Sequence, residues 1–430
     1  ALWQTLPRWL PGVLSHWLPA GSRLELQGKL HWRQGGLTLA GARFTAQDCL
    51  LASVGPTRLA YRQGRWQLSS DKVSVDSACL SKLPGGDANS APLALDQLQR
   101  QLPPLDLTIH DLTLIPWQRY AGKLQLSSGS DGQRLHYRGP NLSAEAQLDE
   151  KQQLTLHSLT VIPPNSAQPL RLAGKITIPL DLASLPTQGA LQGEMQTAYL
   201  EKPVLLDMRW QQQQGVLTVS EKGDDRPLAV LPWEVTPQRV SIKQGEWRWP
   251  YSGQPLNGGL SIALHDWSKG LDETEISARL NVITAGHNGK GNAVLTLGPG
   301  KVGLTDSDLR FQLTGQANLA DFSATASIPG VLGGSILNPT LVLQPGSLLR
   351  LWGKVTPEMT LEEARLPLAG VKVTAAGITG RLQAILSASD SYWGRFKLHL
   401  DGQAQDFWPD KGHWQWRYWG NGRLPPLQAA

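Results

Sequence analysis

The sequence lacks several features that mark common classes of protein. No apolar run reaches the roughly 18 residues that a membrane-spanning helix needs. Charged residues make up only 17% of the chain, against about a quarter in typical globular domains. The net charge of +5 is modest for 430 residues, and the charges are dispersed. Because nucleic-acid binding depends on a clustered basic surface, no nucleic-acid partner is expected.

The common motifs of catalysis and metal binding are also missing. The sequence contains no His-Glu-x-x-His and no Cys-x-x-Cys, so the usual zinc spacings are absent. The GPGK motif at residues 298–301 resembles part of a phosphate-binding loop. However, Leu295 stands where the earlier glycine is required and Val302 follows the lysine, which favours a tight turn. We therefore expect no enzymatic activity, no metal site and no cofactor.

Cysteine is almost absent, with Cys49 and Cys79 the only two. Two such residues are most often buried thiols in a cytosolic protein, but they form a disulfide in an oxidising compartment. A bridge closing a loop of this size stabilises a fold by roughly 3 to 4 kcal/mol in the chain-entropy model. We expect the disulfide if the protein lies outside the cytosol.

What the sequence does contain is a long succession of β-strand patterns. The 44 glycines and 30 prolines favour many short strands joined by turns. The pattern is clearest over residues 259–328, where apolar residues alternate with small or polar ones. Because side chains of a strand point alternately to opposite faces, each strand has one apolar and one polar face. A shift of parity between Ile109 and Leu112 further predicts a bulge or break near Asp111.

The apolar face of these strands is the candidate functional surface. Alternation identifies the face but does not distinguish residues that line an open groove from residues that pack in a dry core. The predicted groove-lining residues are Leu260, Ile262, Leu264, Ile276, Leu280, Val282, Leu309, Phe311, Leu313, Phe322, Ile328, Phe396 and Leu398.

Two segments depart from the strand pattern. Residues 1–22 have apolar residues at roughly helical spacing and several tryptophans, which suits a juxtamembrane helical segment or a helix packed over one end of the sheet. Residues 84–104 are predicted to form a loop and a short helix. We predict an all-β fold, an elongated, mainly antiparallel sheet curled into a hydrophobic groove with short helices near the N-terminus. Its β-groove domain covers residues 23–430 and is interrupted at 84–104.

Tryptophan is unusually frequent, with 17 residues against 5 phenylalanines. Tryptophan at a strand position is usually buried because of its large apolar area. Exposed tryptophans would instead suit a structural or glycan-binding β-sandwich module of the cell envelope, and that remains the alternative to a groove that shelters lipid.

Several blocks of sequence resemble the YdbH family of enteric bacteria, which is similar to the AsmA-like group. The blocks are ordered and spread over most of the chain. They are Asp48 with Cys49, DSACLSKLP (76–84), GKGNAVL (289–295), GPGK (298–301), PLAGVKVT (367–374), GRLQAIL (380–386) and WQWRYWG (414–420).

The resemblance implies a function and a location. It implies intermembrane transport of phospholipid, whose acyl chains are shielded in a hydrophobic β-groove that bridges the periplasm of a Gram-negative bacterium. It also implies an inner-membrane anchor preceding Ala1 and an outer-membrane lipoprotein partner, YnbE, beyond the C-terminal end of this chain. A periplasmic location agrees with a disulfide between Cys49 and Cys79.

Overall fold

A computed structural model describes most of the chain. The described residues are 22–77, 79, 103–164, 167–179, 186–197, 200–250, 255–269, 273–303, 305–335, 338–408 and, for the backbone alone, 411–421. The predicted helical segment 1–22 lies outside them, except for Ser22, which begins a strand. The loop and helix predicted at 84–104 also lie outside them, apart from residues 103 and 104.

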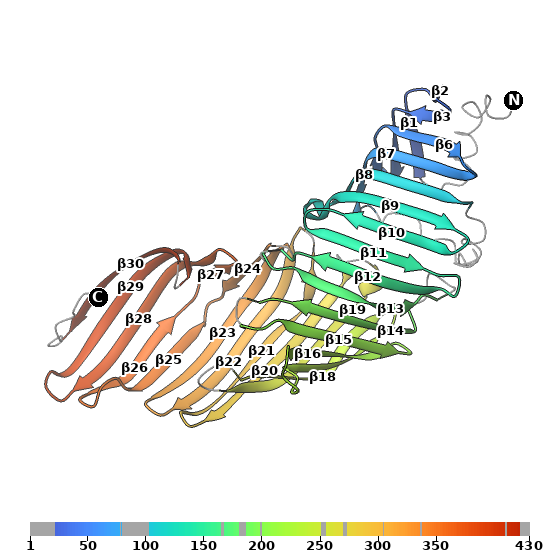
Figure 1. The fold of residues 1–430 in the computed structure, drawn as a ribbon. Helices are drawn as coiled ribbons and strands as arrows, with labels where there is room; N and C mark the ends of the chain where they lie inside the picture. The colour runs from blue at the N-terminus through green and yellow to red at the C-terminus, as the bar shows by residue number, and fades with distance from the viewer. Residues whose placement is uncertain are drawn as a thin grey trace. The chain divides into compact units, whose positions relative to one another are not determined.

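The chain divides into two compact units, Ala1–Asp224 (unit 1) and Asp225–Ala430 (unit 2). Both are built of β-strands, which confirms the predicted fold class (Figure 1). The single domain predicted over residues 23–430 stays a prediction. Among the described residues, no helix combines the length and apolar character of a membrane span.

Within the described residues of unit 1 there are sixteen strands and a short 3-10 helix. They are β1 (Ser22–Gln27), β2 (His31–Arg33), β3 (Gly36–Leu39), β4 (Gly41–Ala46), β5 (Cys49–Val54), β6 (Thr57–Arg62), β7 (Arg65–Asp76), β8 (Leu105–Ile115), η2 (Gln118–Tyr120), β9 (Gly122–Gly129), β10 (Gly132–Arg138), β11 (Leu142–Leu148), β12 (Gln153–Val161), β13 (Leu170–Thr177), β14 (Gln188–Met195), β15 (Val204–Gln211) and β16 (Gln214–Glu221).

In the part of unit 2 that the structure describes there are fourteen strands and a 3-10 helix. They are β17 (Ala229–Val235), β18 (Arg239–Trp249), β19 (Leu256–His265), η3 (Trp267–Lys269), β20 (Glu275–Gly286), β21 (Gly289–Val302), β22 (Ser307–Leu319), β23 (Phe322–Ser335), β24 (Asn338–Leu343), β25 (Leu348–Lys354), β26 (Met359–Pro367), β27 (Lys372–Thr374), β28 (Gly377–Asp390), β29 (Gly394–Trp408) and β30 (Lys411–Asn421).

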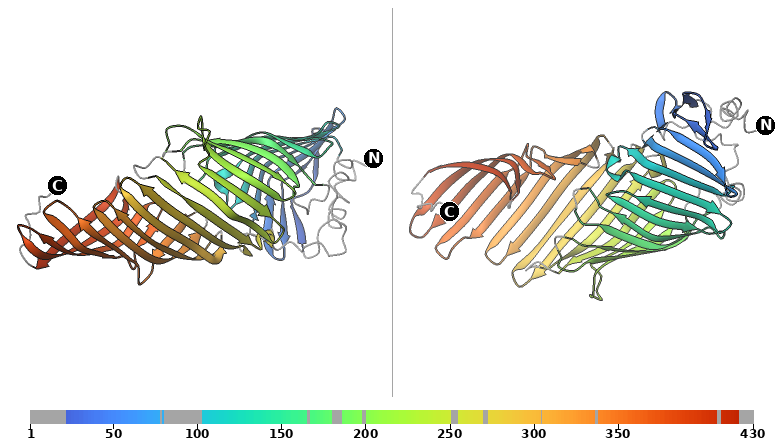
Figure 2. Two further views of the ribbon diagram at one scale, coloured as in Figure 1. Left: turned by 90° about the horizontal axis from the view of Figure 1, so that it is seen from below. Right: turned by 45° about the horizontal axis from the view of Figure 1, so that its top comes forward.

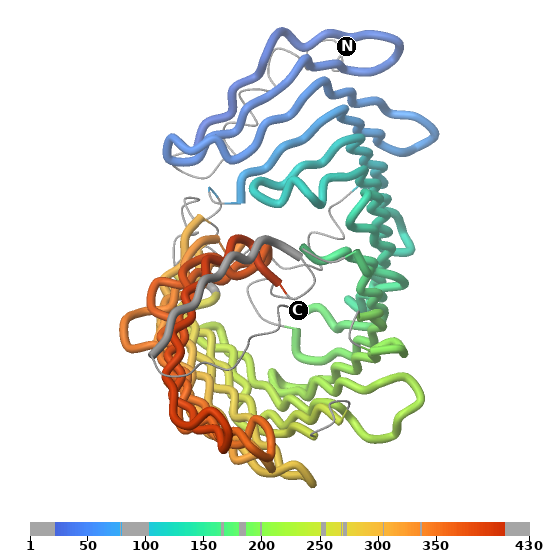
Figure 3. The backbone as a smooth tube through the Cα atoms, turned by 90° about the vertical axis from the view of Figure 1, so that its left-hand side faces the viewer, coloured from blue at the N-terminus to red at the C-terminus, as the bar shows by residue number. Residues whose placement is uncertain are grey.

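Most strands pair with their neighbours in sequence. From β8 to β16, and again from β17 to β23, successive described pairs are antiparallel hairpins. Both views of Figure 2 show the strands of unit 2 from yellow to red as one layer, and Figure 3 shows the backbone running to and fro within each unit. Several turns between strands contain glutamine, aspartate or glycine with a positive φ. In the turn between β6 and β7, for example, the φ of Gln63 is 52° and that of Gly64 is 75°.

Three long strands each pair with two shorter ones along the same edge. In unit 1, β7 pairs with β6 over residues 65–70 and with β5 over residues 73–75. In unit 2, β23 pairs with β25 and β24, and β28 pairs with β26 and β27. In each case two short strands lie one after the other along a single long strand, within the same sheet.

The pair β7 and β8 is parallel, with Trp66 opposite Leu105 and Asp76 opposite Ile115. A parallel pair cannot be joined by a tight turn and needs a long connection. The interruption predicted at 84–104 falls within the connection between these two strands. The predicted bulge near Asp111 is confirmed, since the register of β8 with β9 shifts between Ile109 and Leu112.

The tight turn predicted at residues 298–301 is wrong. These residues form no turn between strands but lie inside β21, where the register with β22 shifts between Leu297 and Lys301. Gly298 has a φ of +74°, and a Cβ there would lie 2.1 Å from the carbonyl oxygen of Ile276. A glycine is therefore required for a bulge rather than for a hairpin.

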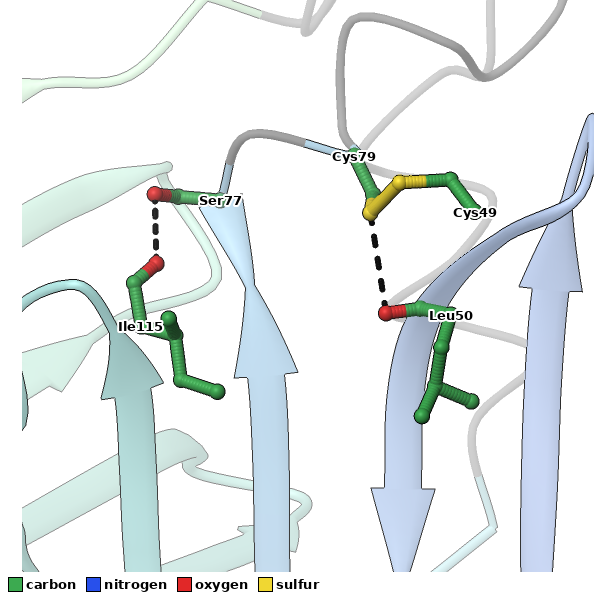
Figure 4. Close-up of a disulfide and its surroundings, with 5 residues drawn as sticks. All are labelled: Cys49, Leu50, Ser77, Cys79 and Ile115. Atoms are coloured by element: carbon green, nitrogen blue, oxygen red, sulfur yellow. Dashed lines mark hydrogen bonds between the residues drawn. A yellow bond between two sulfur atoms is a disulfide. The ribbon is translucent and has the colours of Figure 1, made fainter. Parts of the chain in front are cut away.

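The disulfide between Cys49 and Cys79 is confirmed (Figure 4). It joins the start of β5 to the chain just after β7, across a sequence separation of 30 residues, with 5.7 Å between the Cα atoms. Cys79 is 1% exposed, and its sulfur lies 3.6 Å from the carbonyl oxygen of Leu50. The hydroxyl of Ser77 donates a hydrogen bond of 2.7 Å to the carbonyl oxygen of Ile115. The bridge therefore holds the chain that leaves β7 against the start of β5, close to the place where Ser77 bonds to the end of β8.

Candidate functional site

The registers of unit 2 join apolar residues into rows that cross the sheet. Leu260 lies opposite Leu280, Leu280 opposite Leu295, Leu295 opposite Leu313, and Leu313 opposite Ile328. Directly opposed residues of paired strands project from the same face. This row therefore forms an unbroken apolar line across β19 to β23.

The same argument places the predicted residues of β29 on this face. Leu398 is opposite Leu386, Leu386 opposite Ala364, Ala364 opposite Leu351, and Leu351 opposite Ala324. Strand alternation places the other predicted residues of β19, β20, β22, β23 and β29 on the same side. All thirteen predicted residues thus share one face of unit 2, which we call the apolar face.

The opposite face of the same strands is polar. One row across it consists of Ser261, Arg279, Thr296 and Gln312, each opposite the next. Arg279 and Thr296 are exposed. The sheet therefore separates a polar surface from an apolar one through the thickness of a single layer.

Burial divides the thirteen predicted residues into two groups. Leu309 and Phe396 are only 2% and 8% exposed, and Phe396 packs in a cluster with Leu361, Ala364 and Ala388. The other eleven are half-buried. Leu309 and Phe396 thus contribute to packing within unit 2, whereas the other residues leave part of their apolar surface accessible.

A row of small residues makes a depression in the apolar face of unit 2. Val282, Ala293, Gly315, Ala326 and Leu349 lie opposite one another in turn across β20 to β25. Together with the neighbouring row of Gly291, Ala317 and Ala324 they line a concavity of about 230 Å³. Among these residues the sequence analysis nominated Val282 but none of the glycines and alanines. Their alternation within β21 to β23 was the signal that could have identified them.

Unit 1 has an apolar face of its own, for which the sequence analysis nominated no lining residues. Leu159, Leu172, Gly193, Leu206 and Val219 lie opposite one another in turn across β12 to β16. At Gly193 a Cβ would lie 2.5 Å from the end of the Leu172 side chain, so a larger residue there would require this side chain to shift. The two units therefore share one design, a one-layer sheet with a single apolar face.

An ion pair between Arg65 and Asp106 connects strands of unit 1. The Arg65 Nε donates a hydrogen bond of 3.0 Å to Asp106 Oδ2, and Nη2 donates one of 2.8 Å to Oδ1. Nη2 also donates to the carbonyl oxygen of Ser128 at 2.8 Å. The pair therefore ties together β7, β8 and β9, and the hydrogen bonds from Arg65 lower the pKa of Asp106.

This ion pair predicts a stability that depends on pH. Because the pKa of Asp106 is lower in the folded protein than in the unfolded chain, its contribution is present above the unfolded pKa of about 3.9 and is lost as the pH falls through the folded pKa. We expect Asp106→Asn to lower the free energy of unfolding at pH 7 by about 1 kcal/mol or less, since the carboxylate is 39% exposed.

Urea denaturation of the purified protein at pH values from about 7 down to about 2 measures the effect. The difference between wild type and Asp106→Asn should shrink as the pH falls. Asp131→Asn, in the exposed turn between β9 and β10, is the matched control. A difference that persists unchanged to the lowest pH would contradict the assignment.

The described residues contain no group of three or more His, Cys, Asp or Glu side chains placed to hold a metal ion.

The geometry defines a class of β-protein in which a one-layer, mainly antiparallel sheet presents one apolar face. The comparisons with known proteins assign it further. The chain belongs to the YdbH-like family, described as "Intermembrane phospholipid transport protein YdbH", whose profile matches residues 1–430.

A curated relative supports this assignment. The chain is 42% identical over 432 residues to a protein of Escherichia coli (strain K12) described as "Probable phospholipid transport protein YdbH". The match covers 100% of this chain and 49% of the relative, so the chain spans about half the length of that protein. No solved structure matches the chain significantly.

Proposed function

We propose that this chain is part of a conduit for phospholipid between the inner and outer membranes of a Gram-negative bacterium. The observation that carries the proposal is the apolar face of unit 2, where cross-strand rows of half-buried apolar side chains lie behind a polar outer face. Moving hydrocarbon into water costs about 0.8 kcal/mol per CH₂ group. A continuous row of apolar side chains lowers that cost without any chemical step.

The thirteen residues predicted from sequence are proposed as the lining of this path. The eleven half-buried residues contact acyl chains, and Leu309 and Phe396 support them from within the sheet. The mechanism requires only that lipid tails exchange one set of apolar contacts for the next. Neighbouring strands, about 4.8 Å apart, supply such sets at short intervals along each row.

The proposal includes the location and partners of the whole protein. We place the chain in the periplasm, where the Cys49–Cys79 bridge would persist. The whole protein would be held by an inner-membrane anchor preceding Ala1 and would meet an outer-membrane lipoprotein of the YnbE kind. The description of the E. coli relative supports phospholipid as the cargo. We prefer the conduit to the glycan-binding β-sandwich, because the described strands of each unit pair edge to edge within one hydrogen-bonded sheet.

Photo-crosslinking in cells tests the proposal by comparing the two faces of the same strands. A photo-crosslinking amino acid in place of Leu280 or Leu313 should capture phospholipid, because both residues lie in one apolar row. The same amino acid in place of Arg279 or Gln312, on the polar face, should capture little. Equal capture from both faces, or none from the apolar face, would refute the conduit.

A further inference from the structure

A cavity of about 530 Å³ lies on the apolar face of unit 1, at the end of β8 next to η2. This volume falls within the range of sites that bind small molecules. Its wall is made almost entirely of hydrocarbon and aromatic rings. The lining residues are Val75, Leu112, Leu114, Trp117, Tyr120, Tyr137, Leu142 and Val161.

The two tyrosine hydroxyls of the cavity are bonded to the backbone. The Tyr137 hydroxyl donates a hydrogen bond of 2.5 Å to the carbonyl oxygen of Tyr120, and the Tyr120 hydroxyl donates one of 3.2 Å to the carbonyl oxygen of Ile162. Burial raises the pKa of Tyr137, so this hydroxyl remains a donor at neutral pH. The rings therefore present apolar surface to the cavity, and Leu114, 40% exposed, leaves the cavity accessible.

A cation lies beside this apolar wall. The Arg119 guanidinium carbon is 6.0 Å from the centre of the Tyr120 ring. Its Nη2 donates to the carbonyl oxygens of Pro163 at 3.0 Å and Ile162 at 3.4 Å, while Asn141 donates to the Arg119 carbonyl oxygen at 2.8 Å. Arg119 is exposed, and no described carboxylate forms an ion pair with it. Its position is thus fixed by neutral groups, which leave its charge uncompensated within the described part of the chain.

An apolar cavity beside an uncompensated guanidinium matches the two parts of one kind of ligand. We propose that this cavity is a phospholipid-binding subsite, in which an acyl chain occupies the cavity and the phosphate contacts Arg119. Guanidinium groups bind phosphate through paired, charge-assisted hydrogen bonds. Trp117, Tyr120 and Tyr137 line the cavity, and amphipathic aromatic side chains of this kind are favoured where apolar and polar parts of a lipid meet.

The subsite deepens the proposed function and rests on it, because it assigns lipid selectivity to one place in the conduit. The concavity of unit 2 has no ionisable residue in its lining, so it offers acyl chains contacts that do not depend on the headgroup. The cavity of unit 1 instead favours lipids that carry a phosphate over uncharged lipids with the same tails.

Photo-crosslinking of the full-length protein tests this selectivity. A photo-crosslinking amino acid replaces Leu114, and the protein is incubated with vesicles that contain equal amounts of labelled phosphatidylethanolamine and labelled diacylglycerol. We expect preferential capture of the phospholipid. Arg119→Ala should reduce phospholipid capture about tenfold, which corresponds to about 1.4 kcal/mol, and leave diacylglycerol capture unchanged. Arg119→Lys should retain part of the preference because it retains the charge.

A second crosslinking position separates this inference from the proposed function. The same amino acid in place of Leu313 reports on the apolar face of unit 2, and Arg119→Ala should leave capture there unchanged. Unchanged capture of diacylglycerol at Leu114 shows that unit 1 of this variant is folded. Capture at Leu313 without lipid capture at Leu114 would overturn the subsite alone. Three other results would also overturn the subsite. They are equal capture of both lipids at Leu114, crosslinks from Leu114 to protein instead of lipid, and normal capture of phospholipid by the Arg119→Ala variant. Absence of capture at both positions would refute the conduit itself.

Discussion

Leu280→Asp and Leu313→Asp should each reduce phospholipid transport at least about tenfold while the sheet remains folded. Both residues belong to the row that crosses β19 to β23, and both are half-buried. A carboxylate there would stand among hydrocarbon chains whenever a lipid passes, and charges on the lipid-facing side of a β-sheet are unfavourable. An increase of only about 1.4 kcal/mol in the barrier slows passage tenfold.

The measurement is the exchange of labelled phospholipid between the inner and outer membranes of cells that carry each variant. Thr296→Asp is the matched control, because Thr296 lies on the polar face of the neighbouring strand between Arg279 and Gln312. Circular dichroism and thermal unfolding establish that the variants fold. Folded variants that transport at the wild-type rate would show that lipid does not pass over this row. Loss of folding in both variants would instead assign Leu280 and Leu313 to a dry core.

Removal of the disulfide should have the largest effect on stability. The bridge closes a loop with a sequence separation of 30 residues, for which the chain-entropy model gives a stabilisation of about 3.5 kcal/mol. The double variant Cys49→Ala with Cys79→Ala should therefore unfold at a clearly lower denaturant concentration. Alanine is chosen because Cys79 is buried, and serine would place a hydroxyl in the same position.

Urea denaturation of the oxidised wild type, the reduced wild type and the double variant separates the contribution of the covalent bond from that of the sulfur atoms. The reduced wild type and the variant should have similar midpoints, both below that of the oxidised protein. Identical midpoints for all three proteins would show that the bridge does not limit the unfolding of the segment that it joins.

Local patterns in the sequence predicted the strands and their faces well. The alternation of Ile276, Leu280 and Val282 with polar neighbours identified the apolar side of β20, because the period of two is a property of the strand itself. The parity change between Ile109 and Leu112 likewise revealed the bulge of β8, since a bulge inserts a residue and reverses the alternation.

Features that depend on distant residues were not predictable in the same way. The turn expected at 298–301 was wrong, because glycine and proline mark bulges as well as turns, and only the partner strand β22 distinguishes the two. The parallel pairing of β7 with β8 joins segments separated by a long connection. The burial of Leu309 and Phe396 depends on neighbours from other strands, so alternation alone could not separate them from the more accessible residues of their face.

The cavity of unit 1 shows the same limit. Tyr120 and Tyr137 come from a 3-10 helix and a strand, and Val161 comes from a strand further along the chain. Arg119 had no special sequence context that would distinguish it from the other dispersed basic residues. Its proposed role rests on its position beside the Tyr120 ring and on the neutral carbonyl groups that hold it.

The pairing of most strands with their neighbours in sequence has a consequence for how the protein acquires its structure. Each new hairpin can add to the edge left by the preceding one, so that much of each unit grows as a nearly one-dimensional array with short loops to close. The parallel pair β7 and β8 cannot form in this way, because β8 can join only after the whole connection has been synthesised. Assembly of unit 1 from β8 onward could therefore proceed in the order of synthesis, while its attachment to the N-terminal strands awaits one long-range event.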